Sequence, residues 1–224
     1  MACWTLLSDK DSGRDVAAGL RWLCDDWPRD SGWWQRLLRS FSADRHLASH
    51  NDSYRGWGWT PRTSSWVEPT SFALIALSLS SETLLPGGAA QRRKLAEAML
   101  YDRMCPGGGW NCGNPSVYGV PGDPLVIPTV WALLALRDYP DRRENAASLE
   151  WLERNLAHVQ GPGSLALARI CLEVYGRGWP MIGVGPCDSY RRNEFLRNIP
   201  VVAWMCLAWG GRRHWLTKAS LEMA

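Results

Sequence analysis

One acidic residue stands where a reactive group would be well placed. The chain contains the pair Pro-Thr twice, at Pro69-Thr70 and at Pro128-Thr129, and each pair opens an apolar run rich in Ala and Leu. Glu68 precedes the first pair, whereas Ile127 precedes the second, so the acid is not part of the repeat. If Glu68 faces an apolar pocket, burial makes it a proton donor near neutral pH. If it only begins a helix, it is a favourable partner of the helix dipole. Both interpretations stay open.

Tryptophan is the over-represented residue type, with 15 copies against 3 Phe and 6 Tyr. An indole offers a wide π face and one N–H donor. The enrichment therefore predicts either tryptophans that lock loops onto helices or an aromatic wall around a cavity. Two Gly-rich loops carry several of them, Gly56-Trp57-Gly58-Trp59 and Gly108-Gly109-Trp110. For these loop tryptophans we favour the structural role.

No set of metal ligands or cofactor motif is recognisable. His46 and His50 have the spacing to share a helix face, but they lie in a Ser/Asp/Asn-rich segment and are expected to be solvated. Cys105 and Cys112 have the wrong spacing for a zinc knuckle, and the seven cysteines are expected to be reduced thiols. Nucleophile-elbow and Walker motifs are missing. We expect neither a metal nor a cofactor.

The composition is that of a globular protein, with 46% hydrophobic and 21% charged residues. The sequence contains no apolar run of 18 residues, so no membrane span is predicted. The N-terminus lacks the pattern of a secretory signal. The cytoplasm is the expected location, and peripheral contact with a membrane is left open. The 25 basic and 22 acidic residues are dispersed along the chain, which argues against a nucleic-acid partner. The sequence does not predict an oligomeric state.

The helical periodicity predicts an all-α single domain over residues 1–224, with little room for strands. Helices are expected at Asp15–Trp27 and Trp33–Phe41, and an apolar helix follows Pro69. Together these form a first repeat unit over 15–80. A second unit covers 90–137, a third covers 145–175, and C-terminal helices lie within 194–223.

The repeat unit resembles one found in a known family. It consists of an amphipathic helix, a Gly-Gly-Trp loop and a helix that begins Pro-Thr-x-x-Ala-Leu. This order is similar to the repeat of squalene-hopene cyclases, oxidosqualene cyclases and protein prenyltransferase β subunits. The resemblance covers about residues 15–175. It implies an α/α toroid, with inner helices around an apolar cavity, here as a small or incomplete ring.

The resemblance also implies a chemistry. In the cyclases, an Asp-x-Asp-Asp-Thr-Ala motif precedes an inner helix, and its central Asp donates a proton. On this chain the Thr matches Thr70, the central Asp falls on Glu68, and the flanking acids fall on Trp66 and Pro69. The implied protein is a terpene cyclase-like isomerase or lyase that acts on or binds an isoprenoid or polycyclic lipid, with Glu68 as general acid. The implied substrate-binding residues are Trp57, Trp59, Trp66, Trp110, Asn111, Tyr118 and Trp131.

Two alternatives remain. Because the flanking acids are replaced, the chain can instead be a non-catalytic repeat module that binds a lipid or a protein segment in its concavity. A prenyltransferase-like transferase is less favoured, since its Asp-Gly-Cys zinc motif falls on Glu68-Pro69-Thr70 and on Ile127-Pro128-Thr129. Both positions lack the thiolate that holds the zinc.

Overall fold

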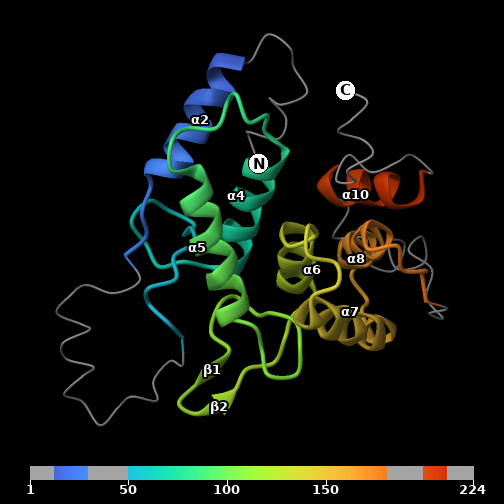
Figure 1. Cartoon of the computed structure of the whole chain (residues 1–224). Coiled ribbons are helices and arrows are strands. Elements are labelled where there is room, and N and C mark those ends of the chain that lie inside the picture. Colours follow the sequence, from blue (N-terminus) through green and yellow to red (C-terminus); the bar gives the residue numbers. More distant parts are fainter. Residues whose placement is uncertain (1–12, 30–49, 181–198, 211–224) are drawn as a thin grey trace. The chain divides into compact units, whose positions relative to one another are not determined.

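The structure of the chain is a computed structural model that describes residues 13–29, 50–180 and 199–210 (Figure 1). Within these ranges it is mainly helical, with seven α-helices, one 3-10 turn and one two-stranded hairpin. The mostly helical prediction is therefore confirmed. The chain divides into two compact units, one within residues 1–106 and 110–123, the other within 107–109 and 124–224. Closure into a toroid, and the single-domain organisation, stay predictions.

The first unit contains α2 (Gly13–Asp25), α4 (Val67–Leu79), α5 (Ala89–Asp102) and the hairpin β1 (Ser116–Val117) and β2 (Val120–Pro121). Its central helix is α4, which packs against α5 and α2. This helix is apolar almost all round and is buried along most of its length, as the Ala/Leu run predicts. Pro69 lies in its first turn, where backbone N–H groups have no partner within the helix, so the proline breaks no helical hydrogen bond.

A buried arginine fastens the loop before α4 to its neighbours. The Arg92 guanidinium on α5 lies between two indoles, 4.0 Å from the ring centre of Trp57 and 4.4 Å from that of Trp27. It donates hydrogen bonds of 3.0–3.1 Å to the carbonyls of Asp26, Arg55 and Gly56. These contacts join α5, the end of α2 and the Gly-Trp loop into one packed corner.

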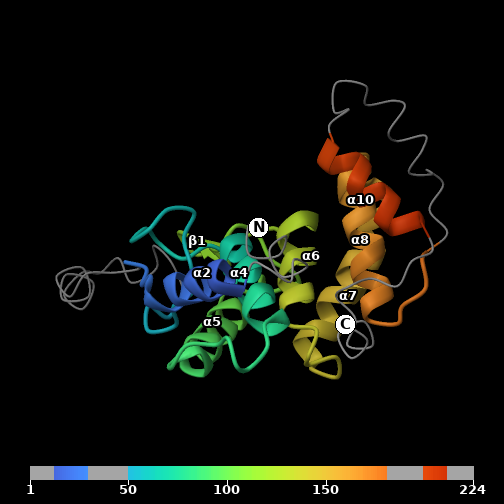
Figure 2. The ribbon, with the colours of Figure 1, turned by 90° about the horizontal axis from the view of Figure 1, so that it is seen from above.

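The second unit contains α6 (Val126–Ala135), α7 (Arg143–Asn155), the 3-10 turn η1 (Leu156–His158), α8 (Pro162–Val174) and α10 (Ile199–Trp209). The helix α8 packs against both α6 and α10, and α7 packs against α6 (Figure 2). Like α4, α6 is apolar and almost wholly buried. The amphipathic helix α7 covers part of it with its apolar side.

Gly109 belongs to the second unit and needs to be glycine for two reasons. Its φ is +74°, and a Cβ atom there would lie 2.8 Å from Thr129 Oγ1 and 2.9 Å from Pro124 Cβ. Its backbone N–H donates to Ser148 Oγ at 2.9 Å. The backbone at Gly109 is therefore pressed closely against α6 and α7.

Several expectations can be compared directly with the described ranges. The predicted helix Asp15–Trp27 is observed at Gly13–Asp25, and the apolar helix after Pro69 already begins at Val67. The hairpin was not predicted. The expected helix Trp33–Phe41 and most of the C-terminal region lie outside the described residues. No helix in the described ranges is long and apolar enough to cross a bilayer. The cytoplasmic location and peripheral membrane contact stay predictions.

Candidate functional site

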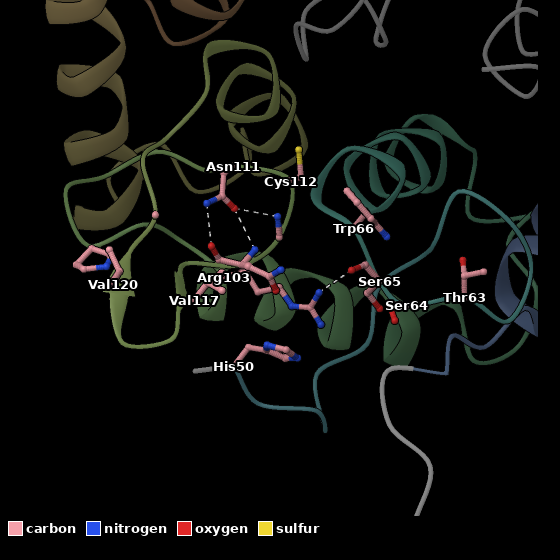
Figure 3. A pocket seen from close by; sticks show the side chains of 14 residues that line it. His50, Thr63, Ser64, Ser65, Trp66, Arg103, Asn111, Cys112, Val117 and Val120 are labelled. Atoms are coloured by element: carbon pink, nitrogen blue, oxygen red, sulfur yellow. Dashed lines mark hydrogen bonds between the residues drawn. The ribbon is translucent and has the colours of Figure 1, made fainter. Parts of the chain in front are cut away.

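The first unit contains a cavity of about 760 Å³, open to solvent, beside the start of α4 (Figure 3). Pockets of roughly 300–1,000 Å³ are the usual size for small-molecule sites. The cavity is formed by two loops, the β1–β2 hairpin, a side chain from the end of α5, and His50. Its lining residues are His50, Thr63–Trp66, Arg103, Asn111–Asn114, Val117 and Val120–Gly122.

Backbone hydrogen bonds hold the cavity's loops at the N-terminus of α4. The Trp66 N–H donates to the Trp57 carbonyl at 2.9 Å, and the Val67 N–H donates to the Cys112 carbonyl at 3.2 Å. The Asn111 side chain closes the second loop, because its Oδ1 accepts the N–H groups of Gly113 and Asn114 at 3.0 Å. Asn111 therefore shapes the wall of the cavity through a local turn.

The polar side of the cavity carries a buried arginine and a histidine. Arg103 is buried, and its Nη1 donates to the Ser65 carbonyl at 2.6 Å. His50 Nε2 lies 3.0 Å from Asp52 Oδ1, which orients the imidazole. None of the described residues that line the cavity is acidic. Arg103 and His50 therefore make this side of the cavity polar.

The cavity does not bring together a thiol nucleophile and a base. Figure 3 shows Cys112 and His50 on opposite sides of the site. Burial raises the pKa of the nearby Cys105 thiol, which disfavours its thiolate. The arrangement is therefore better suited to binding than to thiol catalysis.

Glu68 lies in the first turn of α4 but is not among the residues that line this cavity. Its side chain is half-buried, and burial raises the pKa of its carboxyl group. No hydrogen bond or ion pair joins this carboxyl to another described residue. Phe72 follows one helical turn later, and the Trp59 ring meets it edge-on with 6.2 Å between ring centres. We call Glu68, Phe72 and Trp59 the Glu68 face.

The other sequence-predicted residues are dispersed. Trp57 and Trp110 are buried, and their indole N–H groups donate to the carbonyls of Leu23 at 2.8 Å and Leu100 at 2.6 Å. These bonds are what the structural role of the loop tryptophans requires. Trp131 is buried in the second unit, and Tyr118 is 74% exposed at the hairpin turn. Of the predicted set, only Trp66 and Asn111 line the cavity.

Sequence reasoning missed much of this cavity. It took His50 for a solvated residue, but its side chain is only 11% exposed and pairs with Asp52, so that expectation was wrong. Arg103 gave no signal, because it is one of 22 arginines and stands in no motif. Val117 and Val120 belong to the hairpin that was not predicted. His46 lies outside the described residues.

Neither a metal cluster in the described residues nor a known relative assigns a function to the chain. In the described part of the chain, no three or more His, Cys, Asp or Glu side chains are grouped to hold a metal ion. Comparison with protein families, with curated proteins and with solved structures found no match. The geometry of the cavity and of the Glu68 face is therefore the basis for inferring function.

Proposed function

We propose that the chain binds an isoprenoid or a similar apolar lipid against the Glu68 face and protonates it, as a terpene cyclase-like enzyme. The observation that carries the proposal is the environment of the Glu68 carboxyl group. It is half-buried, it has no described polar partner, and burial raises its pKa. A carboxylic acid in such a place stays protonated to higher pH than one in water.

The sign of this pKa shift separates two explanations of Glu68. A helix N-terminus favours the ionised carboxylate and would lower the pKa. Burial acts in the opposite direction and raises the pKa of the Glu68 carboxyl group. A raised pKa keeps the carboxyl group protonated to higher pH, which is what a proton donor needs. A surface acid that only interacts with a helix dipole has no need of it.

The neighbouring rings suit the intermediate that protonation creates. Addition of the Glu68 proton to a C=C bond or an epoxide leaves a carboxylate and a carbocation. The faces of Phe72 and Trp59, which are in edge-on contact, can stabilise a nearby cation. When the cation finally loses a proton, the carboxylate can be protonated again, so the cycle consumes no cofactor.

A second candidate function is a non-catalytic module that binds an apolar lipid. It is favoured by the residues beside Glu68, because Trp66 and Pro69 stand where cyclases of the resembled family have supporting acids. The half-exposed state of the Glu68 face also falls short of the dry cavity that cation chemistry needs. A transferase of the prenyltransferase type has no support from the described residues.

The test uses the full chain with linear polyprenes such as squalene and with their terminal epoxides. We expect wild-type protein to bind the lipid and to form cyclised products, detected by gas chromatography and mass spectrometry. Glu68→Gln should bind equally well but turn over at least about 100-fold more slowly, since an essential acid contributes about 10²–10⁴-fold. The control is Glu82→Gln, a change at an exposed site after α4, which should behave as wild type.

Each other outcome has a distinct meaning. If both wild type and Glu68→Gln bind the lipid but form no product, the chain is a binding module and the enzyme hypothesis is wrong. Equal turnover in the two proteins would remove Glu68 from catalysis. Failure of the wild type to bind any of the lipids would overturn both candidate functions.

A further inference from the structure

We propose that the cavity beside the start of α4 is a separate binding site for a neutral saccharide. The ligand would place one face of a sugar ring against the Trp66 indole and hydrogen-bond its hydroxyl groups to the surrounding loops. The proposal goes beyond lipid protonation, because Glu68 does not line this cavity. Three features carry it: an exposed indole, neutral polar groups beside it, and charged groups that already have partners in the protein.

Trp66 supplies the flat apolar surface. It lines the cavity and is 41% exposed. Its backbone is held in place, because its N–H donates to the Trp57 carbonyl at 2.9 Å and α4 begins at the next residue. Within the described ranges, no residue accepts a hydrogen bond from its indole N–H. The negative face of an indole attracts the C–H groups on one side of a pyranose ring, and its N–H can donate to a sugar oxygen.

The small polar side chains of the lining are uncharged. Ser64 and Asn114 are exposed, and no described residue bonds to the Ser64 hydroxyl or to the Asn114 carboxamide. The Thr63 hydroxyl donates to the Thr60 carbonyl at 2.7 Å, so its oxygen remains an acceptor. Hydroxyl and carboxamide groups both donate and accept, as the hydroxyl groups of a sugar do. The lining therefore offers both roles to a neutral polyhydroxy ligand.

The charged groups beside the cavity already interact with other protein groups. Arg103 is only 3% exposed, and its Nη1 donates to the Ser65 carbonyl at 2.6 Å. His50 Nε2 lies 3.0 Å from Asp52 Oδ1. A charged ligand would lose hydration in the cavity without gaining a new ionic partner there. A neutral ligand does not carry this cost.

Two valines form an apolar wall opposite the indole. Val117 and Val120 are exposed, although both line the cavity. Figure 3 shows them on one side of Arg103, with Trp66 on the other. The C–H groups of a sugar placed between these walls would gain about 25 cal/mol for each Å² of apolar surface removed from water. A linear polyol has no ring face to lay on the indole and gains less.

The hairpin that holds the valines is fixed at its base. Gly122 donates its N–H to the Pro115 carbonyl at 2.8 Å. A Cβ atom at Gly122 would lie 2.6 Å from Asn111 Nδ2, so the hairpin packs closely on the neighbouring loop. A wall built in advance lowers the entropy that a ligand must overcome. This matters for a sugar, because each of its hydrogen bonds only replaces one to water.

Other ligand classes fit this cavity less well. A wholly apolar lipid would dehydrate the loop hydroxyl and amide groups without giving them a partner. A metal ion would need a cluster of donor side chains, and none is found in the described part of the chain. A neutral sugar satisfies the apolar walls and the polar loops at once.

The first experiment is isothermal titration calorimetry on the full chain. The probes are maltotriose, cellotriose, mannotriose and triacetylchitotriose, with sorbitol as the polyol that lacks a ring. We expect at least one trisaccharide to bind at least about tenfold more tightly than sorbitol. No binding of any trisaccharide, or equal binding of all the probes, would overturn the proposal. The affinity should stay the same between about 0.05 and 0.5 M NaCl, and a marked fall would contradict recognition by neutral groups.

The second experiment removes the indole. Trp66→Ala should weaken binding of the best trisaccharide at least about tenfold, whereas Trp66→Phe, which keeps a ring face, should stay within about threefold of wild type. Trp22→Ala is the matched control, because Trp22 is 54% exposed, lies on α2 of the same unit and does not line the cavity. Equal losses in Trp66→Ala and Trp22→Ala would show that the cavity is not the site.

The third experiment removes single polar groups. Ser64→Ala and Asn114→Ala each delete one neutral hydrogen-bonding group at an exposed loop position, so circular dichroism should stay that of the wild type. Each should weaken binding about two- to tenfold, the effect of one lost neutral hydrogen bond. These two variants decide the question if Trp66→Ala disturbs the fold. Unchanged affinity in both would overturn the proposed recognition of sugar hydroxyl groups.

Discussion

Replacing Arg92 by methionine should destabilise the first unit strongly, although Arg92 belongs neither to the lining of the cavity nor to the Glu68 face. The side chain is buried between two indoles and is hydrogen-bonded to three backbone carbonyls. Methionine keeps most of the volume and fits between rings. It removes every donor and the charge, so the carbonyls of Asp26, Arg55 and Gly56 each lose this partner.

The size of the effect follows from these contacts. A hydrogen bond contributes about 1 kcal/mol net, so three lost bonds amount to about 3 kcal/mol. Two cation–π contacts at 4.0 and 4.4 Å add about 1 kcal/mol or more in total. We therefore expect Arg92→Met to lower the free energy of unfolding by about 4 kcal/mol. For a chain of this length that corresponds to a fall in melting temperature of roughly 10 °C.

The assay is urea unfolding followed by tryptophan fluorescence, because Trp27 and Trp57 flank the mutated side chain. Arg93→Met, on the next residue of α5 and not buried, is the control and should change stability by less than about 0.5 kcal/mol. Arg92→Lys should fall between the two, since it keeps a charge but not the fork. A loss below about 1 kcal/mol in Arg92→Met would refute the proposed role of this corner.

Two further changes test the loop and the acid. Gly109→Ala should cost about 2–4 kcal/mol in thermal unfolding, because it combines a φ of +74° with a clash against α6, whereas Gly107→Ala, which meets no atom within 4 Å, should be nearly neutral. Burial raises the pKa of Glu68 in the folded chain, so ionising it opposes folding; the stability of wild type relative to Glu68→Gln should therefore fall as the pH rises from about 4 to 7. Guanidinium titrations at both pH values measure this difference, and a rise instead of a fall would mean that the helix dipole dominates.

Much of the helical framework could be predicted because its signals are local. The Ala/Leu run after Pro69 is apolar on all sides, and such a run forms a buried helix. The Gly-rich segments around Trp57 and Trp110 contain residues that break helices and rings that need burial, and both indoles are buried with bonded N–H groups. These properties depend on residue type and on short spacing alone.

The cavity could not be predicted because tertiary contacts create it. The hairpin turn has Tyr118 at a left-handed position where Asn or Gly is the usual sequence signal, so the two short strands were not recognised. Arg103 lines the cavity only because the loop that contains Ser65 folds over the end of α5. The spacing of residues 50, 66, 103 and 120 in the sequence therefore does not predict that they line one cavity.

The two helices that begin with Pro-Thr show which residues of the repeat are explained by packing. Thr70 Oγ1 accepts the Trp57 N–H at 2.9 Å, and a Cβ atom on Gly56 would overlap the same hydroxyl. In the second unit, a Cβ atom on Gly109 would likewise lie 2.8 Å from Thr129 Oγ1. In both units, then, the threonine fits against a glycine of the preceding loop, and this fit gives the repeated residues a structural reason.

Glu68 has no counterpart in that shared fit. The equivalent residue of the second unit is Ile127, which is half-buried as Glu68 is. An apolar side chain therefore suffices for packing at this place in α6, and the helix there forms without an acid. Keeping a carboxyl group at the matching position of α4 costs desolvation, as the raised pKa of Glu68 indicates. Packing does not need the acid and burial opposes its charge, so the fit shared by the two units does not account for a carboxyl group at this position.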